Sequence, residues 1–176
     1  LGLRISGSPH ARPRYRLTVA PTARFSPTSF YEKPSFNFFF RGELGESPQD
    51  YAFFPESRVT KFEDMRLRAG KNDVSNPFIK DELMRHIYIG TGQEGARGTF
   101  VSIYMNGIWK GYYNFCEHLR EAFMQQHYGS VARWDVIQTG AFASGDSIHW
   151  NNTFAFLRTN DLTTAANYVK AQDYVD

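Results

Sequence analysis

The stretch Thr99–Glu117, TFVSIYMNGIWKGYYNFCE, decides the architecture of this chain. Two apolar runs flank Asn106-Gly107, and Asn-Gly between alternating apolar residues is a strong short-range signal for a β-hairpin. The alternation places Val101, Ile103 and Met105 on one face of the first arm, and Trp109, Gly111, Tyr113, Phe115 and Glu117 on one face of the second. The stretch therefore predicts a hairpin. It either forms part of a core or leads, past Glu117, into a segment that contacts a ligand.

The composition limits the class of protein. A chain of 176 residues can bury one real core and is short for two domains. A hydrophobic content of 41% with 16% aromatic residues is typical of a globular protein rich in strands. A net charge of +2 without a basic stripe argues against a nucleic-acid partner. The single cysteine, Cys116, excludes an internal disulfide framework and a CxxC metal site. No apolar run approaches the roughly 20 residues of a membrane-spanning helix.

The ends of the chain are informative at this level. The chain begins at Leu1 without a methionine and ends at Asp176 inside a predicted helix. We therefore expect it to be part of a longer polypeptide, so targeting signals cannot be judged from these residues.

The first half is rich in predicted strands, which are Leu1–Ser6, Tyr15–Val19, Ser35–Arg41 and Phe62–Ala69. Residues 20–34 contain three prolines and are predicted to be a loop or insertion. In the third strand the alternation turns Phe36, Phe38 and Phe40 inward. The segment Gly42–Ser57 is predicted to be rich in turns and to end in an apolar plug, Phe53-Phe54-Pro55.

The second half is predicted to be helical around the hairpin. Asn76 and Pro77 have the residue types of a helix cap and of the first helical position. Apolar residues then recur every four positions and predict a helix that packs on the sheet by a one-sided stripe, Ile79, Leu83 and Ile87. After Gly90 and Gly92 and the hairpin, the predicted elements are a helix at 118–127 ended by Gly129, an extended segment at 134–138, a loop at 139–149, and a tail helix capped by Asp161. This order predicts an α+β fold, an antiparallel sheet with one packed helix.

Two signatures of common catalytic and metal sites, HExxH and GxxxxGK[ST], are absent from the sequence. Cys116 lies on the face opposite Glu117 and has the character of a buried apolar side chain. Two clusters leave alternatives open. Arg12, Arg14 and Arg16 form either a solvated strand edge or an anion site. Arg68 and Asp73 either support a turn before a helix or line the rim of a cleft.

Several segments occur in the order found in one known family. They are LRISGS, KPSFNFFFRGELG, FFPES, FEDMRLRAGKNDVSNPFIKDEL, VSIYMNGIWKGYYNFCEHL, HYG and WDVI, and they span roughly residues 1 to 140. The Arg-Ala-Gly-x-Asn-Asp and Asn-Gly-x-Trp-x-Gly blocks are the most specific of them. With these segments the chain resembles the CotH kinase family, the atypical protein kinases named for spore coat protein H.

The resemblance implies a fold and an activity. It implies a protein-kinase-like N-lobe at 1–116, then a hinge and the start of a helical C-lobe at 117–176. Kinases of this family are secreted or spore-associated and transfer phosphate from ATP, with Mg, to Ser or Thr of proteins. We therefore expect a protein substrate and a bacterial extracellular, spore-surface or cell-surface location. The competing hypothesis is a non-catalytic extracellular interaction domain on the same scaffold.

The resemblance also implies roles for individual residues. Lys33 would bind ATP phosphates with Glu82 as its ion-pair partner, and Arg41 could substitute for Lys33, because Pro34 interrupts the family pattern. The remaining expected nucleotide-site residues are Arg68 and Asp73 at the cleft and Glu117 in the hinge beside the base. The catalytic aspartate and the magnesium ligands are expected beyond Asp176, so these 176 residues alone are expected to be inactive.

Overall fold

The computed structural model describes residues 2–6, 34–70, 79–129, 133–138 and 140–174. The chain forms two compact units, Leu1–Ser130 and Val131–Asp176. Several predictions lie outside the described residues: the strand Tyr15–Val19, most of the loop 20–34, the cluster Arg12, Arg14 and Arg16, the helix start at Asn76 and Pro77, and the site residues Lys33 and Asp73.

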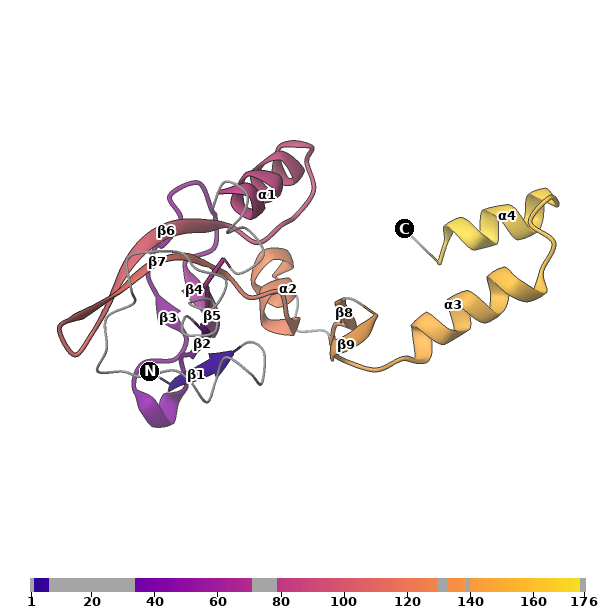
Figure 1. Cartoon of the computed structure of the whole chain (residues 1–176). Helices are drawn as coiled ribbons and strands as arrows, with labels where there is room; N and C mark the ends of the chain where they lie inside the picture. The colour runs from indigo at the N-terminus through magenta and orange to yellow at the C-terminus, as the bar shows by residue number, and fades with distance from the viewer. Residues whose placement is uncertain (1, 7–33, 71–78, 130–132, 139, 175–176) are drawn as a thin grey trace. The chain divides into compact units, whose positions relative to one another are not determined.

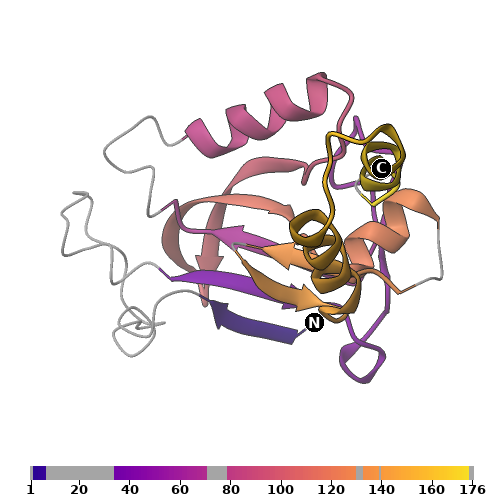
Figure 2. The same cartoon turned by 90° about the vertical axis from the view of Figure 1, so that its right-hand side faces the viewer.

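The first unit contains a five-stranded antiparallel sheet (Figure 1). Its spatial order is β1 (Gly2–Ser6), β2 (Ser35–Phe39), β5 (Asp64–Arg68), β7 (Ile108–Glu117) and β6 (Gly98–Met105). The helix α1 (Lys80–Gly90) follows β5 in the chain and lies over one face of the sheet (Figures 1 and 2). The prediction of an α+β fold with an antiparallel sheet is confirmed.

The hairpin of β6 and β7 forms where the sequence predicts it. Asn106 and Gly107 have φ angles of 51° and 77°, the positive values that a two-residue turn of type I′ requires. One detail of the prediction is wrong. Lys110 is an extra residue in β7, because Ile103 pairs with Gly111 while Tyr104 pairs with Trp109.

This bulge reverses the alternation of side chains before it. Trp109 therefore shares the face of its partner Tyr104, opposite the face of Tyr113 on which the sequence placed it. Its ring lies 5.9 Å from that of Tyr112, which is on the same outer face. Gly111 has φ 99°, a value that a side chain would strain, so glycine makes the bulge possible.

The face of the sheet opposite α1 carries the core. One buried cluster consists of Phe36, Leu67, Ala69 and Tyr113, and a second consists of Phe54, Val59, Phe62 and Met65. Phe38 and Phe115 pack against both clusters and join them. Phe54 is only 1% exposed, which confirms this part of the predicted apolar plug. Each fully buried phenylalanine stabilises the fold by about 1.5–3 kcal/mol.

Short elements carry the second cluster. The short helix η3 (Gly42–Leu44) precedes β3 (Gln49–Asp50), which pairs with β4 (Lys61–Phe62). The predicted strand Phe62–Ala69 is thus divided at Glu63, whose carbonyl accepts the N–H of Phe40 at 2.8 Å.

The orientation of α1 differs from the prediction. Ile79, Leu83 and Ile87 are each about half exposed, whereas Glu82 is only 6% exposed and faces the sheet. The reason is the character of the sheet face beneath the helix, which presents polar side chains, Arg68 and Asn114 among them, in place of an apolar surface.

The segment after the hairpin belongs to the same compact unit. β7 continues to Glu117, and α2 (Glu121–Tyr128) ends at Gly129, whose φ of 63° is typical of a helix C-terminus. The predicted helix is confirmed, although it begins at 121. The predicted lobe boundary at 116/117 lies inside the first unit, which extends to Ser130.

The second unit contains a two-stranded hairpin and two helices. These elements are β8 (Val136–Gln138), β9 (Ala141–Ser144), α3 (Ile148–Thr159) and α4 (Ala165–Gln172). The prediction of a loop over residues 139–149 is wrong, because β9 pairs with β8. Asp161 accepts the N–H and hydroxyl of Thr163, which lowers the pKa of its carboxyl, and this turn leads into α4. None of the described helices combines the length and apolar composition needed to cross a bilayer.

Candidate functional site

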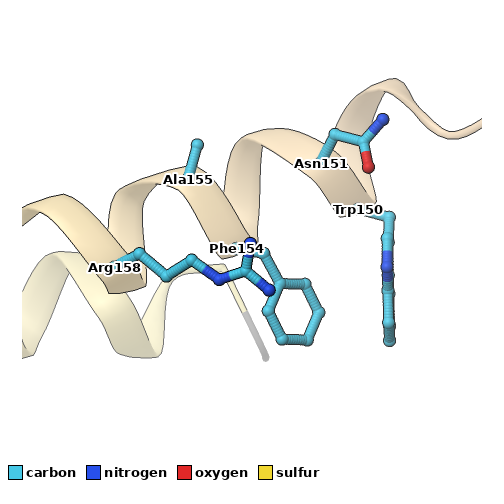
Figure 3. A pocket seen from close by; sticks show the side chains of 5 residues that line it. All are labelled: Trp150, Asn151, Phe154, Ala155 and Arg158. Carbon is cyan, nitrogen blue, oxygen red and sulfur yellow. The ribbon is translucent and has the colours of Figure 1, made fainter.

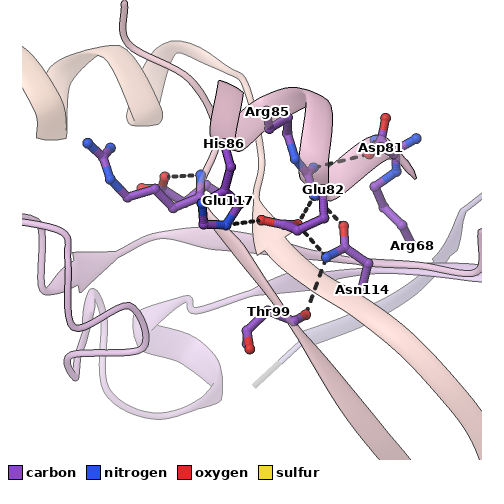
Figure 4. A network of polar contacts seen from close by, with 9 residues as sticks. Arg68, Asp81, Glu82, Arg85, His86, Thr99, Asn114 and Glu117 are labelled. Atoms are coloured by element: carbon purple, nitrogen blue, oxygen red, sulfur yellow. Dashed lines mark hydrogen bonds and ion pairs between the residues drawn. The ribbon is translucent and has the colours of Figure 1, made fainter. Parts of the chain in front are cut away.

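The interface between α1 and the sheet is built from charged and polar side chains (Figure 4). At its centre is the carboxylate of Glu82, which forms an ion pair with Arg85 one turn later. Glu82 Oε2 also accepts the side-chain amide of Asn114 at 2.6 Å, and Oε1 lies 3.2 Å from His86 Nε2. A buried carboxylate requires such partners, because desolvation without them would be costly.

Asn114 on β7 connects this carboxylate to the sheet. Its Nδ2 donates to Glu82 and, at 3.3 Å, to the carbonyl of Thr99 on β6, while its Oδ1 accepts from Arg85 (Figure 4). Gly98 allows the helix to approach this closely, since a Cβ there would overlap Glu82 Oε2. The interface therefore holds one fixed arrangement of donors and acceptors.

A second link joins a strand to the helix. Arg68, at the end of β5, forms an ion pair with Asp81 in the first turn of α1. Arg85 Nη1 approaches the same carboxylate at 3.5 Å. Both Arg68 and Asp81 are about one-third exposed, so solvent screens this pair and it contributes at most about 1 kcal/mol to stability.

Cys116 lies beneath Arg85 on the same face. Burial raises the pKa of the Cys116 thiol, although the neighbouring guanidinium of Arg85 opposes this effect. Burial also disfavours the charge of Arg85, but the neighbouring carboxylates of Glu82 and Asp81 favour it, and the pKa of Arg85 is raised. Arg85 is thus a permanent cation and Cys116 a neutral, unreactive thiol at ordinary pH.

At the end of β7 the carboxylate of Glu117 is held from two sides. Its Oε2 accepts the backbone N–H of Arg97 at 2.8 Å, and its Oε1 lies 2.7 Å from Nε2 of His127 on α2. Nδ1 of His127 lies 3.1 Å from Glu94. These contacts attach α2 to the sheet, and they give Glu117, which is 4% exposed, a structural role.

The second unit has a hollow of about 340 Å³ along α3 (Figure 3). Trp150, Phe154 and Arg158 follow one another at four-residue spacing and line it. The rings of Trp150 and Phe154 lie 4.6 Å apart, and the guanidinium of Arg158 lies 5.8 Å from the Phe154 ring. One helix supplies the entire lining, and its two polar side chains already have contacts, Asn151 with Ser147 and Arg158 with the Phe154 ring, so we assign no chemistry to the hollow.

The structure brings together two of the predicted site residues, Arg68 and Glu82, at the interface of α1 and the sheet. Arg41 is exposed after β2, and its guanidinium lies 5.3 Å from the Phe39 ring. The sequence analysis missed Asp81, Arg85 and Asn114. The i, i+3 and i, i+4 spacing of acidic and basic residues in α1 is a signal that could have identified the first two.

Within the described residues, no group of three or more His, Cys, Asp or Glu side chains is placed to hold a metal ion. Comparisons of the chain with protein-family models, with curated proteins and with solved structures found no match.

Proposed function

We propose that the first unit is the nucleotide-binding part of a CotH-like atypical protein kinase. The complete enzyme would transfer phosphate from ATP, with Mg, to Ser or Thr of a protein substrate outside the cell or on a spore surface. Its catalytic aspartate and magnesium ligands would come from sequence beyond these 176 residues. The sequence segments of the CotH type support this proposal.

The observation that carries the proposal is the charged character of the side of α1 that faces the sheet. A helix that serves only to cover a sheet buries its apolar side, yet α1 exposes Leu83 and buries Glu82. Departures from such a rule concentrate at functional sites, where buried charges are arranged for chemistry or binding. Protein kinases use an ion pair between a strand and the following helix to organise the phosphates of ATP.

By this analogy, Arg68 and Asp81 are candidates for that ion pair. β5 is the strand immediately before α1, and the pair joins the two elements directly. Glu82, by contrast, is already held by Arg85 and Asn114. The role that the resemblance gives to Lys33 and Glu82 remains a prediction, and Arg68 with Asp81 is the alternative that the contacts support.

The proposal is tested with the protein encoded by the complete gene. Purified protein is incubated with ATP labelled at the γ-phosphate and Mg, and label on Ser and Thr is measured. We expect incorporation, and a loss of at least about 10-fold in Arg68→Ala, the scale of removing one electrostatic contact to the transition state. Arg58→Gln, which removes an exposed arginine elsewhere, is the control. A folded protein that neither binds ATP nor incorporates label would refute the proposal.

A second candidate function, an interaction domain without catalysis, is favoured by the outer side of α1. Five large apolar side chains are exposed there: Ile79, Leu83, Met84, Ile87 and Tyr88. Contiguous exposed apolar surface marks protein-interaction sites. This function predicts no stabilisation by ATP and Mg. It also predicts that replacing both Leu83 and Ile87 by serine weakens the association of the protein with further copies of itself, measured by analytical ultracentrifugation.

A further inference from the structure

The guanidinium of Arg66 lies on the α1-facing side of the sheet and has no counter-ion among the residues that the structure describes. Arg66, in the middle of β5, lies between its register partners Asn37 on β2 and Cys116 on β7. It is half-buried, its Nε is fully buried without a hydrogen-bond partner, and it forms no ion pair with any residue that the structure describes. A buried cation normally has a partner.

None of the described carboxylates on this face forms an ion pair with Arg66. Asp64 Oδ1 lies 3.4 Å from Nδ1 of the buried His118. The two acidic residues of α1 form ion pairs with other arginines, Asp81 with Arg68 and Glu82 with Arg85. Among the described residues, Arg66 is thus left without an ion-pair partner, and the carboxylate of Asp81 favours its charge only from a distance.

Beside Arg66 lies a further polar atom for which the described part of the chain provides no hydrogen-bond partner. Oδ1 of Asn37 is also fully buried without a hydrogen-bond partner, and Asn37 is directly opposite Arg66 in the register of β2 and β5. Burial lowers the pKa of Arg66, and the positive charges of Arg68 and Arg120 lower it further. An anion beside the guanidinium of Arg66 would relieve this repulsion.

We propose that Arg66, flanked by Arg68, binds phosphate groups, and that the ligand is the polyphosphate of a nucleotide. The planar guanidinium donates two parallel N–H bonds to phosphate oxygens, the geometry that arginine provides and lysine does not. The assignment of the polyphosphate to a nucleotide rests on the proposed function, whereas the phosphate site itself rests on the guanidinium of Arg66 and the neighbouring charge of Arg68.

The test is calorimetric titration of the chain with inorganic tripolyphosphate and, separately, with ATP and Mg, at constant ionic strength. We expect tripolyphosphate to bind with a dissociation constant on the order of 1 mM. Arg66→Gln should weaken the binding of tripolyphosphate at least fivefold. The affinity of Arg66→Lys should lie between those of the wild type and Arg66→Gln. Arg58→Gln makes the same change of net charge at an exposed position and should bind as the wild type does.

The melting temperature of each variant separates binding from folding. Arg66→Gln removes an unpaired buried charge, so the ligand-free variant should melt no lower than the wild type, whereas loss of an arginine with only a structural role would lower it. The phosphate site would be overturned if tripolyphosphate did not bind at a concentration 10-fold above the expected dissociation constant. It would also be overturned if Arg66→Gln bound tripolyphosphate as tightly as the wild type does. Binding of tripolyphosphate through Arg66, with no tighter binding of ATP and Mg by the complete protein, would support the phosphate site and contradict the proposed function. Phosphate transfer by the complete protein unaffected by Arg66→Gln would support the proposed function and overturn the phosphate site.

Discussion

Gly98→Ala tests the fit of α1 against the sheet. A Cβ at Gly98 would overlap Glu82 Oε2 and would lie 2.9 Å from Cys116 Cβ and 3.1 Å from Arg85 Nη2. The Cys116 Cβ is attached to the backbone of the neighbouring strand and cannot move away. The carboxylate of Glu82, held by Asn114, must therefore shift.

The expected cost follows from two terms. Inserting a methyl group into a closely packed interface costs about 1–3 kcal/mol. Loss of the hydrogen bond from Asn114 to the carboxylate of Glu82 adds up to about 1.5–3 kcal/mol, less what the carboxylate recovers from water. We expect a decrease of about 2–4 kcal/mol in the free energy of unfolding, a large part of the 5–15 kcal/mol typical of a domain.

The assay is urea unfolding followed by circular dichroism. With a slope of about 2 kcal/mol per molar urea, the middle of the usual range, the midpoint should fall by about 1–2 M. Gly42→Ala is the matched control, since a Cβ there meets nothing within 4 Å, and its midpoint should remain close to the wild-type value. If Gly98→Ala were as stable as Gly42→Ala, the close polar packing of α1 would be wrong.

Three further predictions concern single residues. Glu117→Gln should lower the free energy of unfolding by about 1.5–3 kcal/mol in the same urea assay, because the contact of the Glu117 carboxylate with Nε2 of His127 loses its negative charge. An unchanged midpoint would contradict the structural role of Glu117. Burial raises the pKa of the Cys116 thiol, so its stabilising contribution is complete below about pH 8.5, the unfolded value, and is lost as the pH rises towards the folded pKa. The urea midpoint should therefore decrease less from pH 7 to pH 10 in Cys116→Ala than in the wild type. Equal decreases in the two proteins would refute this. Lys33→Ala should slow phosphate transfer by the complete protein at least 10-fold if this lysine contacts phosphates, and an unchanged rate would shift that role to Arg41 or Arg68.

The sheet could be predicted because its signals are local. Asn106-Gly107 specifies a turn through positive φ angles, and the alternation of Phe36 and Phe38 or of Met65 and Leu67 specifies which side of a strand is buried. These signals act between residues a few positions apart. They are therefore readable without knowledge of the tertiary contacts.

The side of α1 that faces the sheet could not be predicted in the same way. The stripe of Ile79, Leu83 and Ile87 is a true amphipathic pattern, but its direction depends on what the opposing sheet face presents. That face presents Asn114, which is 32 positions from Glu82 in the sequence. The face of Trp109 was predicted wrongly for a related reason. The inserted residue Lys110 reverses the alternation of side chains, and no residue type in the sequence signals it.

The most direct test of the phosphate site is to observe the Arg66 side chain during titration with ATP and Mg. The Nε–H groups of the arginines are followed by nuclear magnetic resonance, and the Arg66 signal is identified as the one missing in Arg66→Lys. We predict a progressive shift of the Arg66 signal, with a smaller shift for Arg68 and none for the exposed Arg58. If ATP binds to the protein but the Arg66 signal does not shift, the assignment of this face as the phosphate site is contradicted.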